Sequence, residues 1–182
     1  SVAQIGYISL GFGLASSASV AASFVHIGNH ALIKGGLFMA VGGFVAALGS
    51  RANLSSFVGI GRRMPITATA FTVCGLSLAG LPLTAGFISK LYLVRAILAE
   101  DAYVITALVL LSSALSLIYL WKIIEVMWMQ PAPAKAPNLP ENPAIYVPLW
   151  IVALANIWFG VDASWLVAAS RAAAAALLGG GL

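Results

Sequence analysis

Long apolar stretches that carry very few charges limit the folds open to this chain more than any other feature. Residues 20–48 form a run of 29 residues in which Lys34 is the only charged side chain. Since a helix needs about 20 mostly apolar residues to cross a bilayer, such a run predicts a transmembrane helix. The whole chain is 62% apolar and 8% charged, whereas soluble domains are about half apolar and a quarter charged. We therefore predict an all-α membrane protein.

The same composition excludes several other classes of protein. Disordered segments are polar and charged, so this apolar chain is not one of them. The single Cys74 excludes a secreted domain held together by disulfides. The formal net charge is +4, and in a membrane protein an excess of Lys and Arg reflects the topology of the loops. We expect the lipid bilayer as a partner of this chain, and no nucleic acid.

The apolar stretches predict one transmembrane domain, residues 1–182, with about six helices. A loop rich in prolines cannot be helical, so the stretch QPAPAKAPNLPENP separates the last two spans. The chain begins with Ser1, and no Lys, Arg, Asp or Glu occurs before Lys34. We expect a fragment that starts inside, or just before, a helix of a longer protein. The predicted spans are residues 2–15, 20–48, 64–80, 82–98, 102–129 and 144–169, with polar loops at 49–63 and 130–143.

A cluster of helix-breaking residues interrupts the apolar stretch 64–98. Gly80, Pro82 and Gly86 lie in its middle, and proline removes a backbone donor from any helix. A continuous helix of this length would measure about 52 Å, which is too long for one ordinary span. Either two spans meet at a turn, or one helix breaks in the middle of the membrane. We favour two spans, the second of them broken near Pro82, and the alternative gives five spans in total.

Ionisable side chains in the middle of predicted spans are the candidate functional residues. Lys34 lies about 21 Å of helix rise from either end of its span, too far for its side chain to reach water. His26 and His30 precede it at steps of four residues, which places all three on one stripe of the helix. Histidine has an unperturbed pKa of about 6.5 and readily accepts and releases protons. The stripe therefore favours proton relay over a purely structural role.

Lys90 is a second lysine within an apolar span. It follows Pro82 by eight residues, and broken membrane helices are tolerated only where they are buried in protein or line a cavity. In transporters such breaks mark ion sites. Lys90 is therefore a candidate residue of an ion pathway.

Other kinds of functional site are missing from the sequence. There is no Cys/His cluster with metal-ligand spacing, no phosphate-binding glycine loop and no Ser/His/Asp arrangement. His26 and His30 lie one turn apart on the same helix, so they cannot hold opposite faces of one haem. We therefore expect no catalytic centre, no metal and no cofactor in this chain.

Three motifs resemble a known family of membrane subunits. Residues 1–7 (SVAQIGY), 29–38 (NHALIKGGLF) and 79–90 (AGLPLTAGFISK) are similar, in order, to the antiporter-like subunits shared by respiratory complex I and the multisubunit Mrp cation/proton antiporters. The resemblance implies a fold of about fourteen helices in which two inverted five-helix repeats each form a proton half-channel. It implies that this chain is the C-terminal six helices.

The resemblance also implies roles for individual residues. Lys34 matches the central lysine and His30 the histidine of the family's His-Ala-x-x-Lys helix. Lys90 matches the charged residue of the second broken helix, and His26 lies on the same stripe but is carried over less firmly. The glutamate and lysine of the N-terminal repeat lie outside this sequence, so the chain holds only part of the relay that the family implies.

Within the family, residues 119–126 (YLWKIIEV) resemble the Mrp D-type subunit more than the complex I subunits. We therefore favour a proton-translocating subunit of a monovalent cation/proton antiporter. The alternative is a proton-pumping membrane subunit of NADH:quinone oxidoreductase, in which the chain would be part of a translocase. A third hypothesis is a structural scaffold whose charges only form ion pairs. The implied partners are other subunits of a hetero-oligomeric complex, protons and Na⁺ or K⁺, in a bacterial inner membrane.

Overall fold

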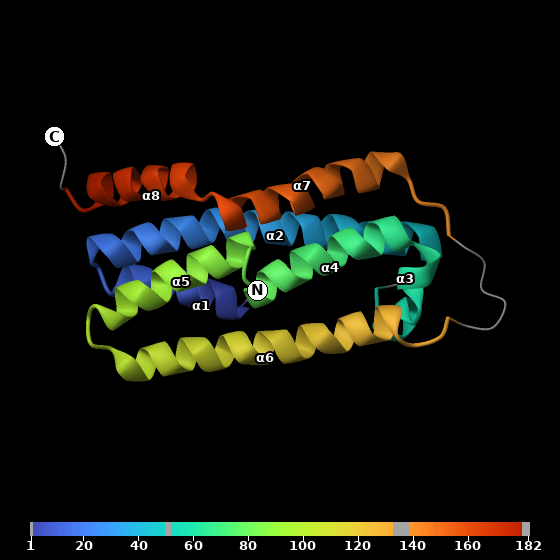
Figure 1. Ribbon diagram of the computed structural model, residues 1–182, viewed down its shortest axis with the longest axis horizontal. Helices are drawn as coiled ribbons and strands as arrows, with labels where there is room; N and C mark the ends of the chain where they lie inside the picture. The colour runs from blue at the N-terminus through green and yellow to red at the C-terminus, as the bar shows by residue number, and fades with distance from the viewer. Residues whose placement is uncertain (1, 50–51, 133–138, 180–182) are drawn as a thin grey trace.

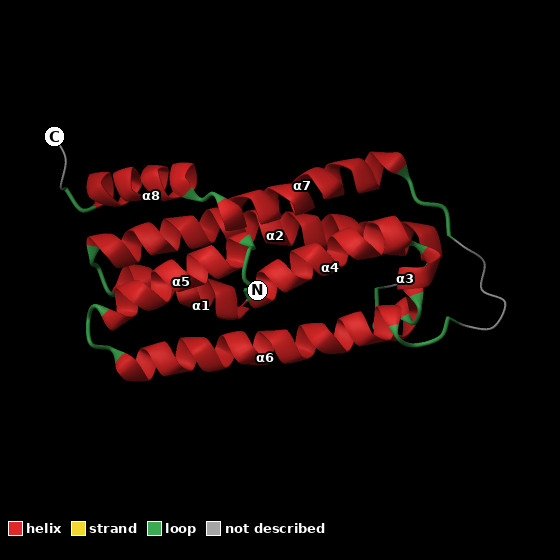
Figure 2. Cartoon of the chain, viewed as in Figure 1, coloured by secondary structure: helices red, strands yellow, loops and turns green. Residues whose placement is uncertain are grey.

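The computed structural model describes residues 2–49, 52–132 and 139–179, and these residues form a layered helical bundle (Figure 1). Within these ranges all regular structure is helical and no strand occurs (Figure 2), which confirms the predicted all-α fold. A short 3-10 helix, Ser55–Phe57, lies between α2 and α3. The helices are α1 (Val2–Gly13), α2 (Ser17–Leu48), α3 (Ile60–Arg63), α4 (Pro65–Ala79), α5 (Ala85–Leu98), α6 (Tyr103–Trp128), α7 (Pro143–Val161) and α8 (Ser164–Leu177).

Helix α2 is the central element of the bundle. It contacts α1, α4, α5, α7 and α8, and its 32 residues make a rod of about 48 Å. Ser16 and Ser19 form a reciprocal capping box at its start, and Gly49 ends it in the left-handed conformation with φ 60°. These caps satisfy backbone groups that a helix leaves unpaired at its ends. The helix therefore begins earlier than the predicted residue 20.

Two pairs of helices lie end to end along α2. In Figure 1 α4 and α5 follow one another in the same direction, and so do α7 and α8. The break near Pro82, predicted from the sequence, is confirmed: α4 ends at Ala79 and α5 begins at Ala85. This arrangement favours the alternative in which residues 64–98 form one span with a break in its middle, not two spans joined by a turn.

The second break was not predicted. The sequence predicts one continuous helix over residues 144–169, but α7 ends at Val161 and α8 starts at Ser164. The reason is local: the side chain of Asp162 accepts a hydrogen bond from the backbone N–H of Ser164 (3.0 Å), and such a cap competes with continuation of the helix.

Among the described residues, three helices are long and apolar enough to cross a membrane singly: α2, α6 and α7. Helices α1, α4 and α8 are apolar but shorter. End to end, α4 with α5 and α7 with α8 extend along most of the bundle (Figure 1). Two shorter helices placed end to end can therefore cross the same thickness of membrane as one long helix.

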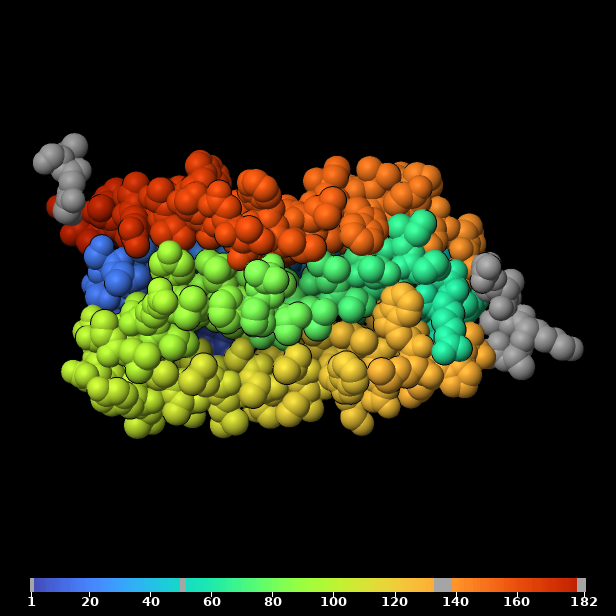
Figure 3. Space-filling view, viewed as in Figure 1, coloured from blue at the N-terminus to red at the C-terminus, as the bar shows by residue number. Residues whose placement is uncertain are grey.

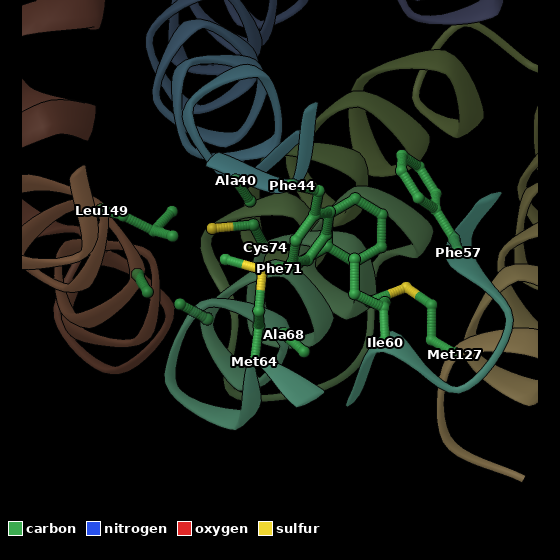
Figure 4. Close-up of a cluster of buried hydrophobic side chains, with 12 residues drawn as sticks. Ala40, Phe44, Phe57, Ile60, Met64, Ala68, Phe71, Cys74, Met127 and Leu149 are labelled. Carbon is green, nitrogen blue, oxygen red and sulfur yellow. The ribbon is translucent and has the colours of Figure 1, made fainter. Parts of the chain in front are cut away.

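A hydrophobic core fills the end of the bundle nearest α3. Figure 4 shows Phe44 and Phe71 from α2 and α4 packed near Phe57, with ring centroids of Phe44 5.4 Å from Phe57 and 6.0 Å from Phe71. Phe44 is fully buried, as are most of its neighbours. The other members of this cluster are Ala40, Ile60, Met64, Ala68, Ala70, Cys74, Met127, Leu149 and Ala153.

The residues just before α7, including Glu141, pack against the start of α4 at this end of the bundle. Glu141 accepts hydrogen bonds from the backbone N–H groups of Ile66 (3.0 Å) and Thr67 (2.7 Å) in the first turn of α4. An acidic group is favourable there because a helix N-terminus carries partial positive charge. The indole of Trp150 donates to the Ile66 carbonyl (3.2 Å), so this segment and α7 are both attached to the start of α4.

Candidate functional site

The backbone between α4 and α5 is irregular over residues 80–84. Gly80 has φ 90°, a left-handed conformation that glycine adopts without a steric penalty. Leu83 has φ 68°, which is unfavourable for a residue with a side chain. Thr84 donates a hydrogen bond from Oγ1 to the Leu81 carbonyl at 2.6 Å. The turn therefore ends α4, lets the chain change direction slightly and starts α5.

Lys90 binds the open end of α4. Its Nζ donates to the carbonyls of Leu78 (3.0 Å) and Ala79 (2.9 Å) and to Oγ of Ser113 on α6 (2.9 Å). An ammonium group has three donors, so all three are used. Lys90 is only 7% exposed, and a buried charge requires such partners. The last carbonyls of a helix carry partial negative charge, which further favours a cation at this place.

A second polar chain joins the two half-helices to α7. Asn156, fully buried on α7, accepts a hydrogen bond from the Oγ of Ser77 through its Oδ1 (3.0 Å). The Oγ of Ser77 in turn accepts a hydrogen bond from the backbone N–H of Gly86 (3.2 Å). Gly86 packs so closely on the Ser77 carbonyl that a Cβ would overlap it. The end of α4, the start of α5 and α7 are therefore held in one arrangement.

Helix α2 contributes polar side chains to the same region. Asn29 donates from Nδ2 to the Ala85 carbonyl at 2.7 Å. His26 Nδ1 lies 2.9 Å from Oγ of Ser89, one residue before Lys90 on α5. Both Asn29 and His26 are buried. The break is therefore surrounded by hydrogen-bonding groups from α2, α5, α6 and α7.

Aromatic rings connect Lys90 with the histidine stripe. The ring centroid of the buried Tyr7, on α1, is 5.9 Å from Lys90 Nζ and 5.7 Å from the ring centroid of His26. The rings of His26 and His30 stack with centroids 6.0 Å apart and an interplanar angle of 10°. The structure thus brings Lys90, His26 and His30 into one continuous series of neighbours.

Lys34 lies at the edge of this series. Its Nζ stands 4.4 Å from the ring centroid of Phe38, and Phe38 is 67% exposed. Lys34 itself is only partly buried. Its cation–π contact therefore lies on an open face of α2, and its role in proton relay stays a prediction.

Unpaired buried atoms line the same stripe of α2. Among the described residues, four buried side-chain atoms lack a hydrogen-bond partner, and three of them are His26 Nε2, Asn29 Oδ1 and His30 Nδ1. Buried polar atoms of this kind are the usual partners of internal water. Lys90 also lines a cavity of about 200 Å³ between α5 and α6, together with Gly80 and Ser113. The polar stripe of α2 and a cavity lined mainly by apolar residues therefore both adjoin the break.

The two breaks touch. A Cβ at Gly160, two residues before Asp162 at the end of α7, would overlap the Leu83 carbonyl and the Cα of Thr84. The turn between α4 and α5 therefore packs against the end of α7, at the level where α8 begins. Among the described residues, no group of three or more His, Cys, Asp or Glu side chains could hold a metal ion.

Sequence reasoning singled out Lys90, the break and both histidines, but missed Tyr7, Asn156, Ser77 and Ser113. Asn156 carried a usable signal, because an amide in the apolar stretch 144–161 needs a partner inside the bundle. Ser77 and Ser113 carried no such signal, since a serine hydroxyl in a helix can form a hydrogen bond with the backbone of its own helix. Their roles depend on contacts between residues that are far apart in the sequence.

The fold and this site define a class of protein: a helical integral membrane protein in which a buried lysine occupies a helix break. The model of the family described as NADH:quinone oxidoreductase/Mrp antiporter, transmembrane, matches residues 1–116. The chain belongs to this family.

Relatives and solved structures agree with this assignment. The chain is 41% identical over 145 residues to the N-type subunit of the NADH-quinone oxidoreductase of Desulforudis audaxviator, covering 79% of this chain and 29% of that protein. It is 30% identical to the D-type subunit of the Na⁺/H⁺ antiporter of Bacillus subtilis over 166 residues, 91% of this chain and 34% of that protein. The chain therefore spans about a third of the length of these relatives.

Two solved structures share the fold. A chain of the membrane-bound sulfane sulfur reductase, an archaeal respiratory membrane complex, superimposes with a TM-score of 0.85 at 31% identity, over 98% of this chain and 37% of that chain. A chain of the Mrp complex from Dietzia sp. superimposes with a TM-score of 0.84 at 24% identity, over 96% of this chain and 41% of that chain. Both structures are of membrane complexes.

Proposed function

We propose that the chain is the C-terminal part of a proton-translocating subunit of a multisubunit monovalent cation/proton antiporter, similar to the Mrp D-type subunit. The observation that carries the proposal is Lys90, a buried ammonium group in a helix break with a cavity beside it. A membrane protein tolerates such a charge mainly where ions or protons move. The complex would reside in a bacterial inner membrane and exchange protons for Na⁺ or K⁺.

The hydrogen bonds around Lys90 suit a group that gains and loses a proton. After deprotonation the neutral amine keeps two N–H groups for the carbonyls of Leu78 and Ala79. In the structure the hydroxyl of Ser113 donates to the Ala79 carbonyl at 3.2 Å. After deprotonation of Lys90 the same hydroxyl can turn and donate to the lone pair of the amine. A rotation of one hydroxyl hydrogen is therefore enough to satisfy both charge states. This lowers the cost of each proton transfer, because no polar group is left unpaired.

In this proposal His26 and His30 carry protons from the Lys90 site along α2 toward Lys34. Tyr7 stands between Lys90 and His26, and the unpaired ring nitrogens Nε2 of His26 and Nδ1 of His30 are places where water can bridge. Lys34 lies on an open face of α2. That face would meet the part of the full-length protein that is outside this chain.

A second candidate is a proton-pumping membrane subunit of NADH:quinone oxidoreductase. The higher identity to an N-type subunit of that enzyme favours it. In that case the same residues would move protons, but the free energy would come from electron transfer in other subunits and not from a cation gradient.

The test uses the full-length subunit assembled with its partner subunits in inverted membrane vesicles that contain a pH-sensitive dye. Proton movement triggered by Na⁺ or K⁺, and lost in an assembled Lys34→Ala complex, supports the antiporter. Proton movement that responds to an electron donor and not to cations supports the second candidate. Assembled Lys34→Ala complexes with full transport would remove Lys34 from the pathway. A native gel establishes assembly in each case.

A further inference from the structure

A cleft at the opposite end of the bundle from α3 carries two arginines from two different helices. It has a volume of about 450 Å³ and lies between the start of α2, the end of α5 and the middle of α8. In Figure 3 the start of α2 is visible as blue atoms between α8, in red, and α5, in yellow-green. Arg95 from α5 and Arg171 from α8 both line it.

The floor and walls of the cleft are small and apolar. Ala21, Ala22 and Ala96 are buried beneath it, and Ala18, Val25 and Val167 also line it. None of the described residues that line the cleft is acidic; Glu100 and Asp101 follow α5 but do not line it. The cleft therefore combines an apolar groove with two cationic groups that no carboxylate in it neutralises.

In a bundle that spans a bilayer the helix ends lie near the headgroup layers, and both arginines lie toward the end of a helix. Arg95 is in the last turn of α5, and Arg171 is six residues, about 9 Å, before the end of α8. The long apolar stem of arginine lets its charged end reach the interface from such a depth. Tyr92 lines the same cleft, and tyrosine is enriched at membrane interfaces.

We propose that this cleft binds an anionic phospholipid, with its phosphate between Arg95 and Arg171 and one acyl chain along the alanine floor. Guanidinium groups bind phosphate oxygens through paired hydrogen bonds. Basic pockets between membrane helices are known to take anionic headgroups of this kind. None of the residues that line the cleft is one of the proposed proton-carrying residues, so the proposal does not depend on the proposed transport function.

The test uses the full-length subunit in its complex, stripped of lipid in detergent and titrated with single lipids while bound lipid is counted by native mass spectrometry. Phosphatidylglycerol and cardiolipin are expected to bind, and phosphatidylcholine at least fivefold more weakly. Arg95→Gln and Arg171→Gln should each weaken binding about fivefold, and the double variant about thirtyfold, since each arginine near a headgroup contributes about 1 kcal/mol. Lys122→Gln, which removes one charge from an exposed site on α6, is the matched control and should bind as wild type does.

A second variant tests the groove without changing its charge. Ala18→Phe, at an exposed position on the rim, should block the acyl chain and weaken lipid binding while leaving both arginines in place. Inorganic phosphate is included as a competitor. If phosphate displaces the lipid at equal concentration, the site is an anion site and the proposal is wrong. It is equally overturned if the double arginine variant binds lipid as tightly as wild type, or if a neighbouring subunit covers the cleft and the wild-type complex binds none.

Discussion

Two regions of the bundle, the end nearest α3 and the middle where α4 meets α5 (Figure 1), are built from different side chains, although α2 runs through both. Near α3, Phe44 and Phe71 pack in a large cluster of buried hydrophobic side chains (Figure 4). Near the break, the buried side chains include His26, Asn29, Lys90 and Asn156. The difference follows from the backbone: continuous helices satisfy their own carbonyls, whereas a broken helix exposes them and needs polar partners.

The comparison separates contacts that we expect to serve stability from contacts that we propose to serve transport. The apolar end can hold the bundle together by packing alone. The polar middle offsets the cost of its buried charge with a complete set of hydrogen bonds around Lys90. Variants at the apolar end should therefore change stability only, while variants at the break should change transport as well.

The largest loss of stability is expected at the apolar end. Phe44→Ala removes a fully buried ring and should lower the free energy of unfolding by about 3–5 kcal/mol. Transport per assembled complex should be unchanged. Thermal unfolding of the purified complex measures the first effect, with Leu111→Ala on the exposed face of α6 as control. A transport defect in assembled Phe44→Ala complexes would contradict the separation between a stabilising core near α3 and a transport region at the break.

Gly86→Ala should have the next largest effect. Its Cβ would overlap the Ser77 carbonyl, so α5 must shift away from α4, at about 1–3 kcal/mol. The shift also moves Lys90, so transport should fall. The control is Gly35→Ala, since a Cβ at Gly35 meets no atom within 4 Å. If Gly86→Ala were as stable and as active as Gly35→Ala, the tight junction would have no functional importance.

Asn156→Ala tests the link from α7 to the break. It leaves the hydroxyl of Ser77 without its side-chain acceptor, and we expect a loss of about 1–3 kcal/mol together with slower transport. A double-mutant cycle with Ser77→Ala measures the coupling, which should be at least about 0.5 kcal/mol for contacting residues. Strictly additive effects would show that the two side chains act independently.

The smallest effect is expected at the start of α4. Glu141 accepts from Ile66 with one oxygen and from Thr67 with the other. Glu141→Gln keeps one of these acceptors, replaces the other with an NH2 group that cannot accept, and removes the charge, so stability should fall by about 1 kcal/mol. The loss should shrink at high salt, which thermal unfolding at two salt concentrations can show. Glu100→Gln, in the turn after α5, is the control, and an equal loss there would contradict the capping role.

The elements of this bundle were easier to predict from the sequence than their arrangement. Apolar stretches located the helices, and Gly80 with Pro82 located the first break, because these are local properties of the chain. The direction of α5 relative to α4 depends on contacts with other helices and not on the local sequence. For this reason the sequence favoured two spans over one broken span. The second break depended on Asp162 capping Ser164, a short pattern hidden between two apolar runs.

The candidate site was predicted in part for the same reason. A lysine in an apolar span is conspicuous, so Lys90 and Lys34 stood out. The partners of Lys90 did not, because two are backbone carbonyls and the third is a serine on another helix. Tyr7 could not be recognised from the sequence, because only the packing of α1 brings it close to both Lys90 and His26.

The most direct test of the central claim compares Lys90 variants in the assembled, full-length complex. The measured quantity is the initial rate of proton movement per assembled complex in inverted vesicles, for Lys90→Ala, Lys90→Arg and the exposed control Lys122→Ala. We predict that Lys90→Ala assembles but loses transport by about 100-fold, and that Lys122→Ala behaves as wild type. Lys90→Arg should assemble yet transport poorly, since arginine does not release its proton. Wild-type transport by assembled Lys90→Ala or Lys90→Arg complexes would show that Lys90 only caps a helix, and would contradict the account.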